Sequence, residues 1–455
     1  MKHPFTDIAT TDLPALRDDS EPVFVDRTDL RERIDRWASR LAGPRSLVFL
    51  LIPNTVDGVA SLLGAWKAGH AVALLDPCLP ADTVAALVSR YGPEYLISPS
   101  GGGRLDITTG PAGGPIGDET ALLLSTSGST GSPKFVRLSL TALHHNASAI
   151  AEVLDIRDTE TGFGHLPLHY SYGLSILTSH LVRGAPVTLT GHKMTDAAFW
   201  TVARDAKVAH FPGVPFHFQT MERLRYERLQ LPDVRVFTQA GGNLPEPSRQ
   251  RVHEYMDSRG GRFHVMYGQT EAGPRMTTLA HDDFDQAPLS VGKALPGGEI
   301  RIVGVGATGV AAGETGHVVY SGPNVMLGYA ESRADLALGD VMGGRLETGD
   351  LGYLDSAGRL TLTGRAKRFG KVYGLRVDLD AVERMVSTIT PAAVVQTGDF
   401  VHIFVTPEAD DPNAIVDVLA GRYTLPRTTY RIHTLSEIPT TERGKIDYQG
   451  LAART

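Results

Sequence analysis

Strand-length apolar runs alternate with segments of helical periodicity along the first hundred residues, and this alternation constrains the fold more than any other feature. Ser46–Ile52 is a nearly continuous apolar run, and Ala71–Leu75 and Tyr95–Ile97 are shorter runs of the same kind. Apolar residues recur at helical spacing in Leu30–Leu41 and Val59–Ala68. A chain that alternates in this way predicts stacked α/β layers with largely parallel sheets.

The pattern of expected secondary structure changes after about Gly292. Short strands with glycine turns follow, among them Glu299–Val303 and Arg359–Thr363, and they indicate a β-rich subdomain. The last part holds a helix candidate at Leu379–Ser387, a strand at Val401–Thr406 and a second helix at Pro412–Gly421. We therefore expect a large layered N-terminal domain with a β-rich subdomain, followed by a small α+β domain. The 455 residues are too many for one compact core.

Charge and cysteine content exclude several classes of function. The chain carries 44 basic and 51 acidic residues, a net charge of −7, with no run of Lys or Arg, so neither nucleic acid nor an anionic membrane is an expected partner. Cys78 is the only cysteine and cannot form an internal disulfide, which favours a reducing compartment. The N-terminus has no apolar signal segment, and no apolar run reaches membrane-spanning length. We expect a cytoplasmic protein.

Leu122–Lys134 reads LLLSTSGSTGSPK, an apolar strand that enters a loop of glycines and hydroxyl residues. Small residues let backbone N–H groups approach phosphate oxygens, and Lys134 adds positive charge. The spacing differs from the G-x-x-x-x-G-K-[ST] pattern, so the usual nucleotide loop before a helix is not implied. The segment is a candidate phosphate-binding loop, although a plain surface turn is the alternative.

This loop resembles the signature loop of the adenylate-forming superfamily, which comprises acyl-CoA synthetases, peptide-synthetase adenylation domains and luciferases. Four further segments resemble motifs of that family in its order: YGQTE at Tyr267–Glu271, ETGD at Glu347–Asp350, GRAKRFGKVYGLRV at Gly364–Val377 and PTTERGKID at Pro439–Asp447. The likeness spans nearly the whole chain and is closest to stand-alone acyl-CoA synthetases. It implies that residues 1–364 form the N-terminal domain and residues 365–455 a mobile C-terminal domain.

The resemblance also implies which residues bind ATP and Mg²⁺. Tyr267, followed by Gly268, would stack on adenine, Thr270 would contact phosphate, and Glu271 would help to hold Mg²⁺. Asp350 would bind the ribose hydroxyls, and Arg365 ribose or phosphate. The residues implied around the phosphates are Thr126, Ser127, Gly128, Ser129, Thr130, Gly131 and Lys134.

The C-terminal motifs imply three further roles. Lys445 would be the adenylation lysine, Lys367 the hinge of the mobile domain, and Gly374 part of the path that admits a thiol. A carboxylate that attacks the α-phosphorus of ATP builds negative charge on the phosphoryl group and on pyrophosphate, so cations and N–H donors must converge there. Lys445 and Thr270 are therefore the leading catalytic candidates, together with His169.

LPLHYSYGLS, Leu166–Ser175, resembles the family's acyl-pocket segment. His169 stands where many members place a residue that gates the carboxylate, although a histidine between Leu168 and Tyr170 could also be a core residue. Tyr172 and Phe216 are further candidates, with packing equally plausible for both. Ala240, Gly241 and Gly242 are candidates for adenine contact, and Gly241 also for the substrate.

The same segment bears on the substrate. Members that activate amino acids use an acidic residue here to pair with the α-ammonium group, because a buried cation needs a partner. Phe163–Leu177 contains no Asp or Glu, so an aryl or alkyl acid is favoured over an α-amino acid.

The resemblance implies acyl-adenylate formation with release of pyrophosphate and then transfer to a thiol, most readily coenzyme A. Alternatives are the phosphopantetheine of an acyl-carrier protein, an amine or another small nucleophile. A degenerate protein that binds nucleotide without catalysis is a further alternative.

Overall fold

The computed structural model of the chain describes residues 4–7, 11–21, 23–100, 104–111, 113–125, 134–304, 309–365, 369–372, 375–407, 415–417, 419, 426–441 and 446–455. The chain divides into two compact units. The first comprises Met1–Glu299 and Tyr320–Leu346, and the second comprises Ile300–Val319 and Glu347–Thr455. The predicted boundary between residues 364 and 365 lies inside a strand of the second unit, so the predicted domain limits stay a prediction.

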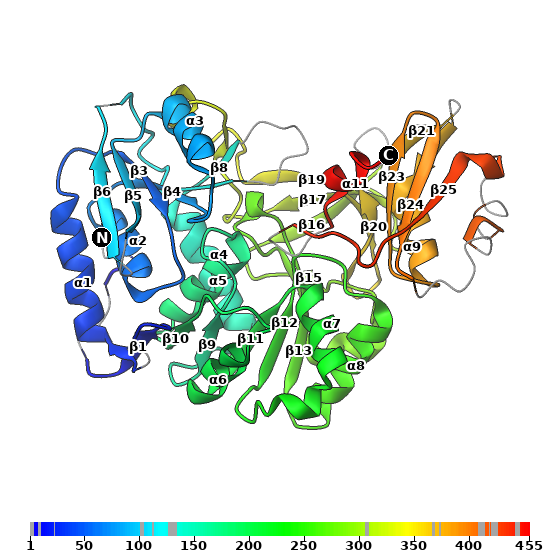
Figure 1. Cartoon of the computed structure of the whole chain (residues 1–455), viewed down its shortest axis with the longest axis horizontal. Coiled ribbons are helices and arrows are strands. Elements are labelled where there is room, and N and C mark those ends of the chain that lie inside the picture. The colour runs from blue at the N-terminus through cyan, green and yellow to red at the C-terminus, as the bar shows by residue number, and fades with distance from the viewer. Residues whose placement is uncertain are drawn as a thin grey trace. The chain divides into compact units, whose positions relative to one another are not determined.

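One sheet of the first unit has seven strands in the order β18-β8-β7-β4-β3-β5-β6 (Figure 1). Its four central strands run parallel, and β6, β8 and β18 are antiparallel to their neighbours. The strands are β3 (Leu47–Leu51), β4 (Ala71–Leu75), β5 (Tyr95–Ser100), β6 (Arg104–Thr109), β7 (Leu122–Ser125), β8 (Phe135–Leu138) and β18 (Gly328–Ala330). The accompanying helices are α1 (Arg27–Arg40), α2 (Val56–Lys67) and α3 (Ala81–Tyr91), with the 3₁₀ turn η5 (Ala334–Ala337).

These elements confirm the predicted alternation of strands and helices. The apolar run Ser46–Ile52 contains β3, whose five residues are all buried. Asp26 caps α1 by accepting from the N–H of Asp29, and Thr55 caps α2 in the same way. With these caps, α1 begins directly after β2 and α2 begins after the loop that follows β3.

The other sheet of the first unit has nine strands in the order β15-β14-β13-β12-β11-β9-β10-β1-β2. They are β1 (Pro14–Arg17), β2 (Val25–Asp26), β9 (Thr161–Gly164), β10 (Val187–Leu189), β11 (Val208–Gly213), β12 (Val236–Gln239), β13 (Arg262–Tyr267), β14 (Thr277–Leu279) and β15 (Lys293–Ala294). The helices are α4 (Leu140–Val153), α5 (Ser171–Leu181), α6 (Ala197–Asp205), α7 (Pro215–Leu224) and α8 (Glu246–Asp257), with the 3₁₀ turns η2 (Tyr226–Leu229), η3 (Thr270–Ala272) and η4 (His281–Gln286). From β1 to β13 the neighbours β1, β10, β9, β11, β12 and β13 pair in parallel.

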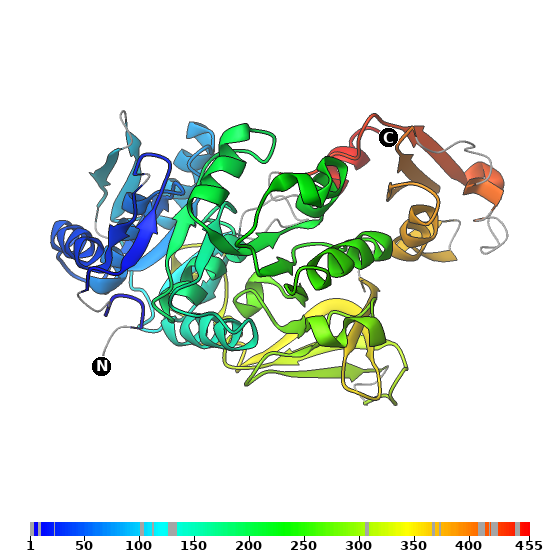
Figure 2. The ribbon, with the colours of Figure 1, turned by 90° about the horizontal axis from the view of Figure 1, so that it is seen from below.

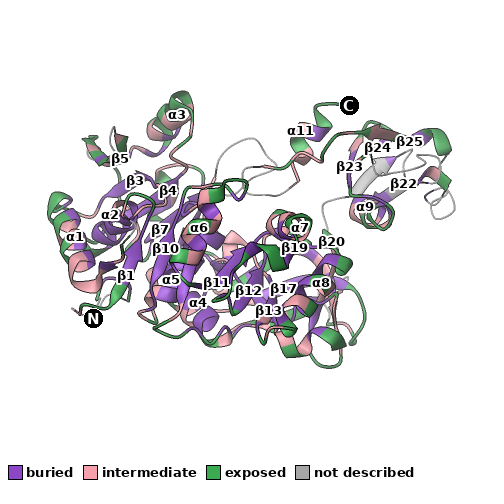
Figure 3. Ribbon diagram, turned by 60° about the horizontal axis from the view of Figure 1, so that its bottom comes forward, coloured by how far each residue is buried: buried purple, intermediate pink, exposed green. Residues whose placement is uncertain are grey.

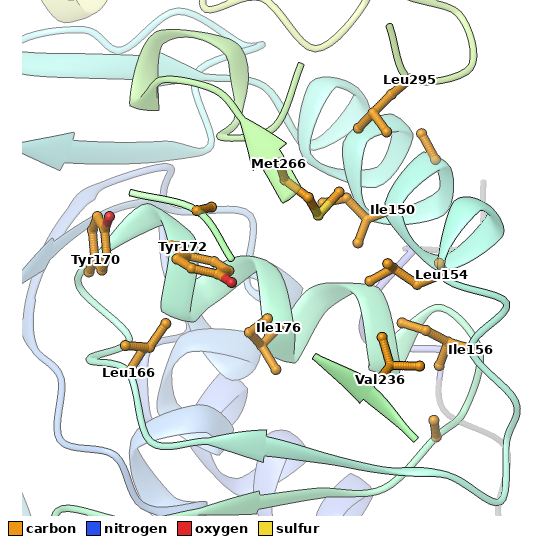
Figure 4. Packing of buried hydrophobic residues seen from close by; sticks show 14 of the residues in the cluster. Ile150, Leu154, Ile156, Leu166, Tyr170, Tyr172, Ile176, Val236, Met266 and Leu295 are labelled. Carbon is orange, nitrogen blue, oxygen red and sulfur yellow. The ribbon is translucent and has the colours of Figure 1, made fainter. Parts of the chain in front are cut away.

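Helix α5 is buried along nearly its whole length, from Ser171 to His180 (Figure 3). It packs against α4 and β9. A helix without an exposed polar face is covered by protein on all sides. The core beside it joins Ile150 of α4, Tyr172 and Ile176 of α5, Val236 of β12 and Met266 of β13 (Figure 4).

The second unit contains the antiparallel strand pairs β19–β20, β21–β22 and β23–β24 and the parallel pair β24–β25. The four-stranded sheet β16-β17-β19-β20, most of whose residues belong to this unit, is seen in yellow and yellow-green in Figure 2. The strands are β16 (Glu299–Val303), β17 (Gly316–Ser321), β19 (Arg345–Leu354), β20 (Leu360–Arg365), the hairpin β21 (Phe369–Val372) and β22 (Leu375–Asp378), and the sheet of β23 (Ala392–Thr397), β24 (Phe400–Val405) and β25 (Tyr430–Thr434). The helices are α9 (Leu379–Ser387) and α11 (Tyr448–Ala452), with the 3₁₀ turn η6 (Arg427–Thr429).

The predicted elements of the C-terminal part are largely found. The helix predicted at Leu379–Ser387 is α9, and the strand predicted at Val401–Thr406 is β24, shifted by one residue. Of the second predicted helix, the structure describes residues 415–417 and 419, which are helical. Within the described part of the chain, every helix is too short or too polar to cross a membrane.

Candidate active site

The carboxyl ends of four parallel strands lie along one edge of the nine-stranded sheet. The register places Gly213 at the end of β11 beside Gln239 at the end of β12, and Gln239 beside Val265 near the end of β13. Strand β9 pairs with β11 on the other side. In open α/β sheets, ligands bind outside the carboxyl ends of the strands. The segments that follow these strands, at residues 165–170, 214–216, 240–242 and 268–271, contain most of those predicted site residues of the first unit that the structure describes.

A loop of the seven-stranded sheet contacts the loop after β9 in the nine-stranded sheet. Asn54 follows β3, and its side-chain nitrogen donates to the carbonyl oxygens of Gly164 (3.2 Å) and Leu166 (3.0 Å). Its side-chain oxygen accepts from the N–H of Leu168 at 3.0 Å. Asn54 therefore fixes the loop after β9, which carries the acyl-pocket candidates, although the sequence interpretation did not include this residue.

His169 lies against a carboxylate. Its Nε2 is 3.5 Å from Oδ2 of Asp76, which directly follows β4. The other carboxylate oxygen of Asp76 accepts from the N–H of Cys78 at 2.8 Å. His169 is 8% exposed, so the carboxylate orients a largely buried imidazole. Asp76 was missed from sequence; the only signal for it was an acidic residue directly after a buried strand.

The loop after β13 is shaped by a close backbone approach at Gly268. A Cβ on Gly268 would lie 1.8 Å from the carbonyl oxygen of Pro274 and 2.7 Å from Cα of Arg275, so only glycine fits here. Beyond it the hydroxyl of Thr270 lies 3.0 Å from that of Ser171, the first residue of α5. This bond fixes the hydroxyl predicted to contact phosphate, and Ser171 is a further residue that the sequence interpretation did not identify.

Glu271 and Lys134 are brought together by Tyr329 of β18. The Tyr329 hydroxyl donates to Oε1 of Glu271 at 2.8 Å, and Nζ of Lys134 lies 3.6 Å from the centre of the Tyr329 ring. Burial raises the pKa of Tyr329, and the adjacent carboxylate raises it further, so the phenol stays a donor. Tyr329 lies outside every sequence motif, so this cluster could not be predicted from sequence.

The donor set around Glu271 fits Mg²⁺ that is held together with phosphate oxygens. Mg²⁺ is bound through one or two carboxylates plus substrate phosphates rather than by an all-protein cage. Among the described residues, there is no group of three or more His, Cys, Asp or Glu that could hold a metal ion by itself. The carboxylate of Glu271, which shares Tyr329 with the candidate phosphate-binding residue Lys134, satisfies the first requirement.

The glycines after β12 are packed closely. Gly241 has φ of +82°, and a Cβ there would lie 2.6 Å from the Tyr170 hydroxyl. Ala240 is buried, and the carbonyl oxygen of Gly242 accepts from the side chain of Gln239 at 2.8 Å. The backbone at the predicted adenine contact is thus fixed by its neighbours.

The two aromatic candidates have different surroundings. Tyr172 is 3% exposed, and its hydroxyl donates to the carbonyl oxygen of Thr238 at 2.8 Å. Phe216, in the first turn of α7, is 45% exposed. Tyr172 therefore packs in the core beside the strand ends, whereas the ring of Phe216 is open to solvent.

Two neutral histidines hold the loop between β11 and α7. Nε2 of His165 lies 2.7 Å from the carbonyl oxygen of Pro212, and Nδ1 of His217 accepts from the N–H of Val214 at 3.1 Å. Burial lowers the pKa of His165 to about 4 and lowers that of His217 well below its usual value. Both imidazoles are therefore uncharged at neutral pH and act as hydrogen-bonding groups.

In the second unit, Asp350 and Arg365 are partners across the β19–β20 ladder. Nε of Arg365 donates to Oδ1 of Asp350 at 2.9 Å. Asp350 is 5% exposed, whereas the side chain of Arg365 is 59% exposed. The preceding turn is fixed by Thr348, whose hydroxyl donates to Val318 and accepts from the N–H of Asp350. The two residues predicted to contact the nucleotide are therefore neighbours.

Several predicted residues lie outside the described part of the chain. They are Thr126, Ser127, Gly128, Ser129, Thr130, Gly131, Lys367, Gly374 and Lys445. Their assignments rest on sequence alone.

Known proteins are similar to this chain over most of its length. The family model described as AMP-binding enzyme matches residues 9–111 and 108–330. Indoleacetate–CoA ligase of Aromatoleum aromaticum is 30% identical over 357 residues, which is 74% of this chain and 69% of that protein. D-alanine–D-alanyl carrier protein ligase of Bacillus licheniformis is 26% identical over 451 residues, which is 86% of this chain and 86% of that protein.

A likeness to solved structures supports the fold. The crystal structure of ATP-bound MatB from Rhodopseudomonas palustris superposes with a TM-score of 0.82 over 99% of this chain and 97% of that one. The sequence identity is 19%, so this comparison bears on the fold alone. The predicted α/β architecture of a large layered domain and a smaller C-terminal domain is confirmed.

Proposed function

The chain belongs to the AMP-binding enzyme family of acyl-CoA and acid ligases, and we propose that it activates an aryl or alkyl carboxylic acid and transfers the acyl group to coenzyme A. The observation that carries the proposal is the convergence of the predicted acyl-pocket and nucleotide segments at the carboxyl edge of one sheet. The Asp76–His169 pair and the Ser171–Thr270 hydroxyl pair lie among these loops.

In the first half-reaction, a substrate carboxylate oxygen attacks the α-phosphorus of ATP, and the bond to the pyrophosphate oxygen breaks. Thr270 would donate to the phosphate oxygens, and Lys134 and Lys445 would offset their charge. Glu271 would hold Mg²⁺, which supplies Lewis-acid stabilisation of the phosphoryl group when bound. Asp350 and Arg365 are the proposed ligands of the ribose.

In the second half-reaction, the thiol sulfur attacks the acyl carbonyl carbon and the thiol proton is released to solvent, and AMP leaves with the bonding electrons of the carbon–oxygen bond. We propose that residues 365–455 rotate about Lys367 between the two steps and that Gly374 lines the path of the thiol. The likeness to a carrier-protein ligase supports the phosphopantetheine of a carrier protein as the second candidate acceptor. The cytoplasm is the proposed compartment.

One acidic residue, Asp76, contacts the acyl-pocket segment although it lies outside that segment in the sequence. Asp76 lies against His169, so its carboxylate already has a partner. We therefore keep the proposal that an α-amino acid is disfavoured. A pocket for an α-ammonium group would need a carboxylate that is free to pair with it.

The test is exchange of labelled pyrophosphate into ATP with a panel of aryl, alkyl and α-amino acids. Exchange with one acid establishes adenylation, and release of AMP on adding coenzyme A establishes the acceptor. Exchange without such release directs the search to carrier proteins and amines. Lys445→Ala should lower exchange at least about 100-fold if the lysine stabilises the charge on the transferring group. An unchanged rate in this variant would contradict the mechanism, and exchange with no acid would favour a non-catalytic protein.

A further inference from the structure

Arg275 is a fully buried cation beside the candidate site. Arg275 comes shortly after the loop of Gly268 in the sequence, and it is 1% exposed. Nη1 donates to the sulfur of Met266 at 3.1 Å, and the guanidinium carbon lies 4.6 Å from the centre of the Tyr172 ring. Nε and Nη2 have no hydrogen-bonding partner among the described residues. The guanidinium thus contacts a thioether and an aromatic face, neither of which is an anion.

A structural arginine in the same unit has a different environment. Arg249 is 3% exposed, and all three of its nitrogens are bonded. Nε donates to Leu244 at 2.8 Å, Nη1 to the carbonyl oxygens of Pro288 and Ser290, and Nη2 to Asn243 at 2.9 Å. Burying an unpaired charge is costly, and a ring face offsets only part of that cost. Arg275 therefore lacks the partners that a purely structural buried arginine has.

The position of Arg275 connects it to the acyl-pocket candidates. The ring of Tyr172, which the guanidinium contacts, is 6.2 Å from the ring of Tyr170. Figure 4 shows the two tyrosines. The Tyr170 hydroxyl lies against Gly241. Arg275 itself packs its backbone against Gly268. The guanidinium therefore lies beside two aromatic residues of the acyl-pocket segment, and the backbone of Arg275 lies beside the nucleotide segment that follows β13.

We propose that Arg275 is a specificity-determining residue that binds a second carboxylate of the substrate. The inference rests on the proposed function and makes the acid a dicarboxylic acid that is activated at one end only. Nε and Nη2 are the two donors on one side of a guanidinium, the pair that holds a carboxylate through two parallel hydrogen bonds. The distal carboxylate stays unchanged while the other one forms the acyl–phosphate bond. The cation would also repel an α-ammonium group, in agreement with the disfavoured amino acid.

The experiment compares acids matched in length. Pyrophosphate exchange is measured with straight-chain α,ω-dicarboxylates and with n-alkyl monocarboxylates of the same number of carbons, and with the three benzenedicarboxylates against benzoate. The wild-type enzyme should favour the best dicarboxylate over its monocarboxylate about 100-fold or more in kcat/KM, because a site built for a charged partner rejects an analogue that lacks it. The best dicarboxylate should also raise the melting temperature of the wild-type protein.

Three variants separate specificity from stability. Arg275→Met should lose the preference for the dicarboxylate and its thermal shift, and Arg275→Lys should keep part of both because it retains the charge. Arg249→Met, the matched buried arginine, should lower the melting temperature and leave the preference unchanged. If Arg275→Met does not fold, Arg275→Lys decides, because a Lys variant with the full wild-type preference and thermal shift would overturn the role of the guanidinium.

A wild-type preference for monocarboxylates, or an Arg275→Met protein that still prefers the dicarboxylate, would overturn the inference while leaving adenylation intact. Absence of exchange with every acid would instead overturn the proposed function. The two failures are therefore distinguishable.

Discussion

The candidate residues of the two units are assembled in opposite ways. Ser171 and Thr270, 99 positions apart in the sequence, meet at the edge of a parallel sheet. Asp350 and Arg365 are 15 positions apart and meet across neighbouring antiparallel strands. A parallel sheet gathers loops from distant segments at one edge, whereas a hairpin brings together what is already close along the chain. The placement of the candidate residues in the first unit should therefore depend on how distant segments pack, whereas in the second unit it should depend on the geometry of two neighbouring strands.

Glycine substitutions should expose this difference most strongly. Gly268→Ala places a Cβ 1.8 Å from a backbone oxygen, so the loop after β13 must move. We expect a loss of about 3 kcal/mol or more in unfolding free energy, together with most of the exchange activity. Gly349→Ala is the control, because its φ of +75° is unfavourable but no atom lies within 4 Å of the added Cβ. It should cost only about 1 kcal/mol. Equal melting-temperature losses in the two variants would contradict the comparison.

Glu271→Gln should be the next largest effect. The amide keeps the shape of the side chain but removes the charge proposed to hold Mg²⁺. Pyrophosphate exchange should fall about 100-fold to 1,000-fold, and the Mg²⁺ concentration for half-maximal rate should rise. Tyr329→Phe, which removes only the hydrogen bond to Glu271, serves as control and should change the rate much less. An unchanged Mg²⁺ requirement in Glu271→Gln would argue against the metal role.

Acidification should weaken the first unit through its buried histidines. His264 is 3% exposed, and burial, with the nearby charge of Arg262, lowers its pKa to about 3 from a usual value of 6.5. In the unfolded chain this histidine binds a proton below about pH 6.5, whereas in the native protein it binds one only below about pH 3. The unfolded state therefore gains protons first, and the free energy of unfolding falls as the pH is lowered from about 6.5 to about 3. Each such histidine contributes a slope of about 1.4 kcal/mol per pH unit.

His264→Leu should reduce this slope. Its melting temperature should fall less between pH 7 and pH 5 than that of the wild type, because one titrating group is removed. A variant with an unchanged pH profile would show that His264 is not a source of the acid sensitivity.

Ser171→Ala tests the long-range hydroxyl pair. Loss of one partly buried hydrogen bond is worth about 1 kcal/mol, so the exchange rate should fall about fivefold through poorer placement of Thr270. Thr270→Val should cost more, and the double variant should cost no more than Thr270→Val alone, because both changes act on the same bond. Additive losses would mean that Ser171 acts independently of Thr270.

Arg365→Gln should have the smallest effect on stability. The side chain is largely exposed and its ion pair with Asp350 is screened by solvent, so the free energy of unfolding should change by less than about 0.5 kcal/mol. A higher KM for ATP with an unchanged melting temperature is the expected result. A large fall in melting temperature would mean that the pair is structural rather than part of a ligand site.

The sequence predicted the local parts of this molecule well. The alternation of apolar runs and helical periodicity identified β3, β4, α1 and α2, because burial of one face leaves a periodic trace in the chain. The predicted helix at Leu379–Ser387 coincides with α9 for the same reason. The order of the motifs also gave the family, which the comparisons confirm.

The sequence by itself determined the elements, the family and the chemical types of the candidate residues. Tertiary structure alone decided their partners: Asp76 against His169, Tyr329 between Lys134 and Glu271, and a buried Arg275 over Tyr172. These pairs depend on strand order and on how α5 packs, and periodicity along one segment carries no information about a neighbour far away in the chain. Local sequence fixes which groups are present, but the meeting of loops at a sheet edge fixes what each group touches.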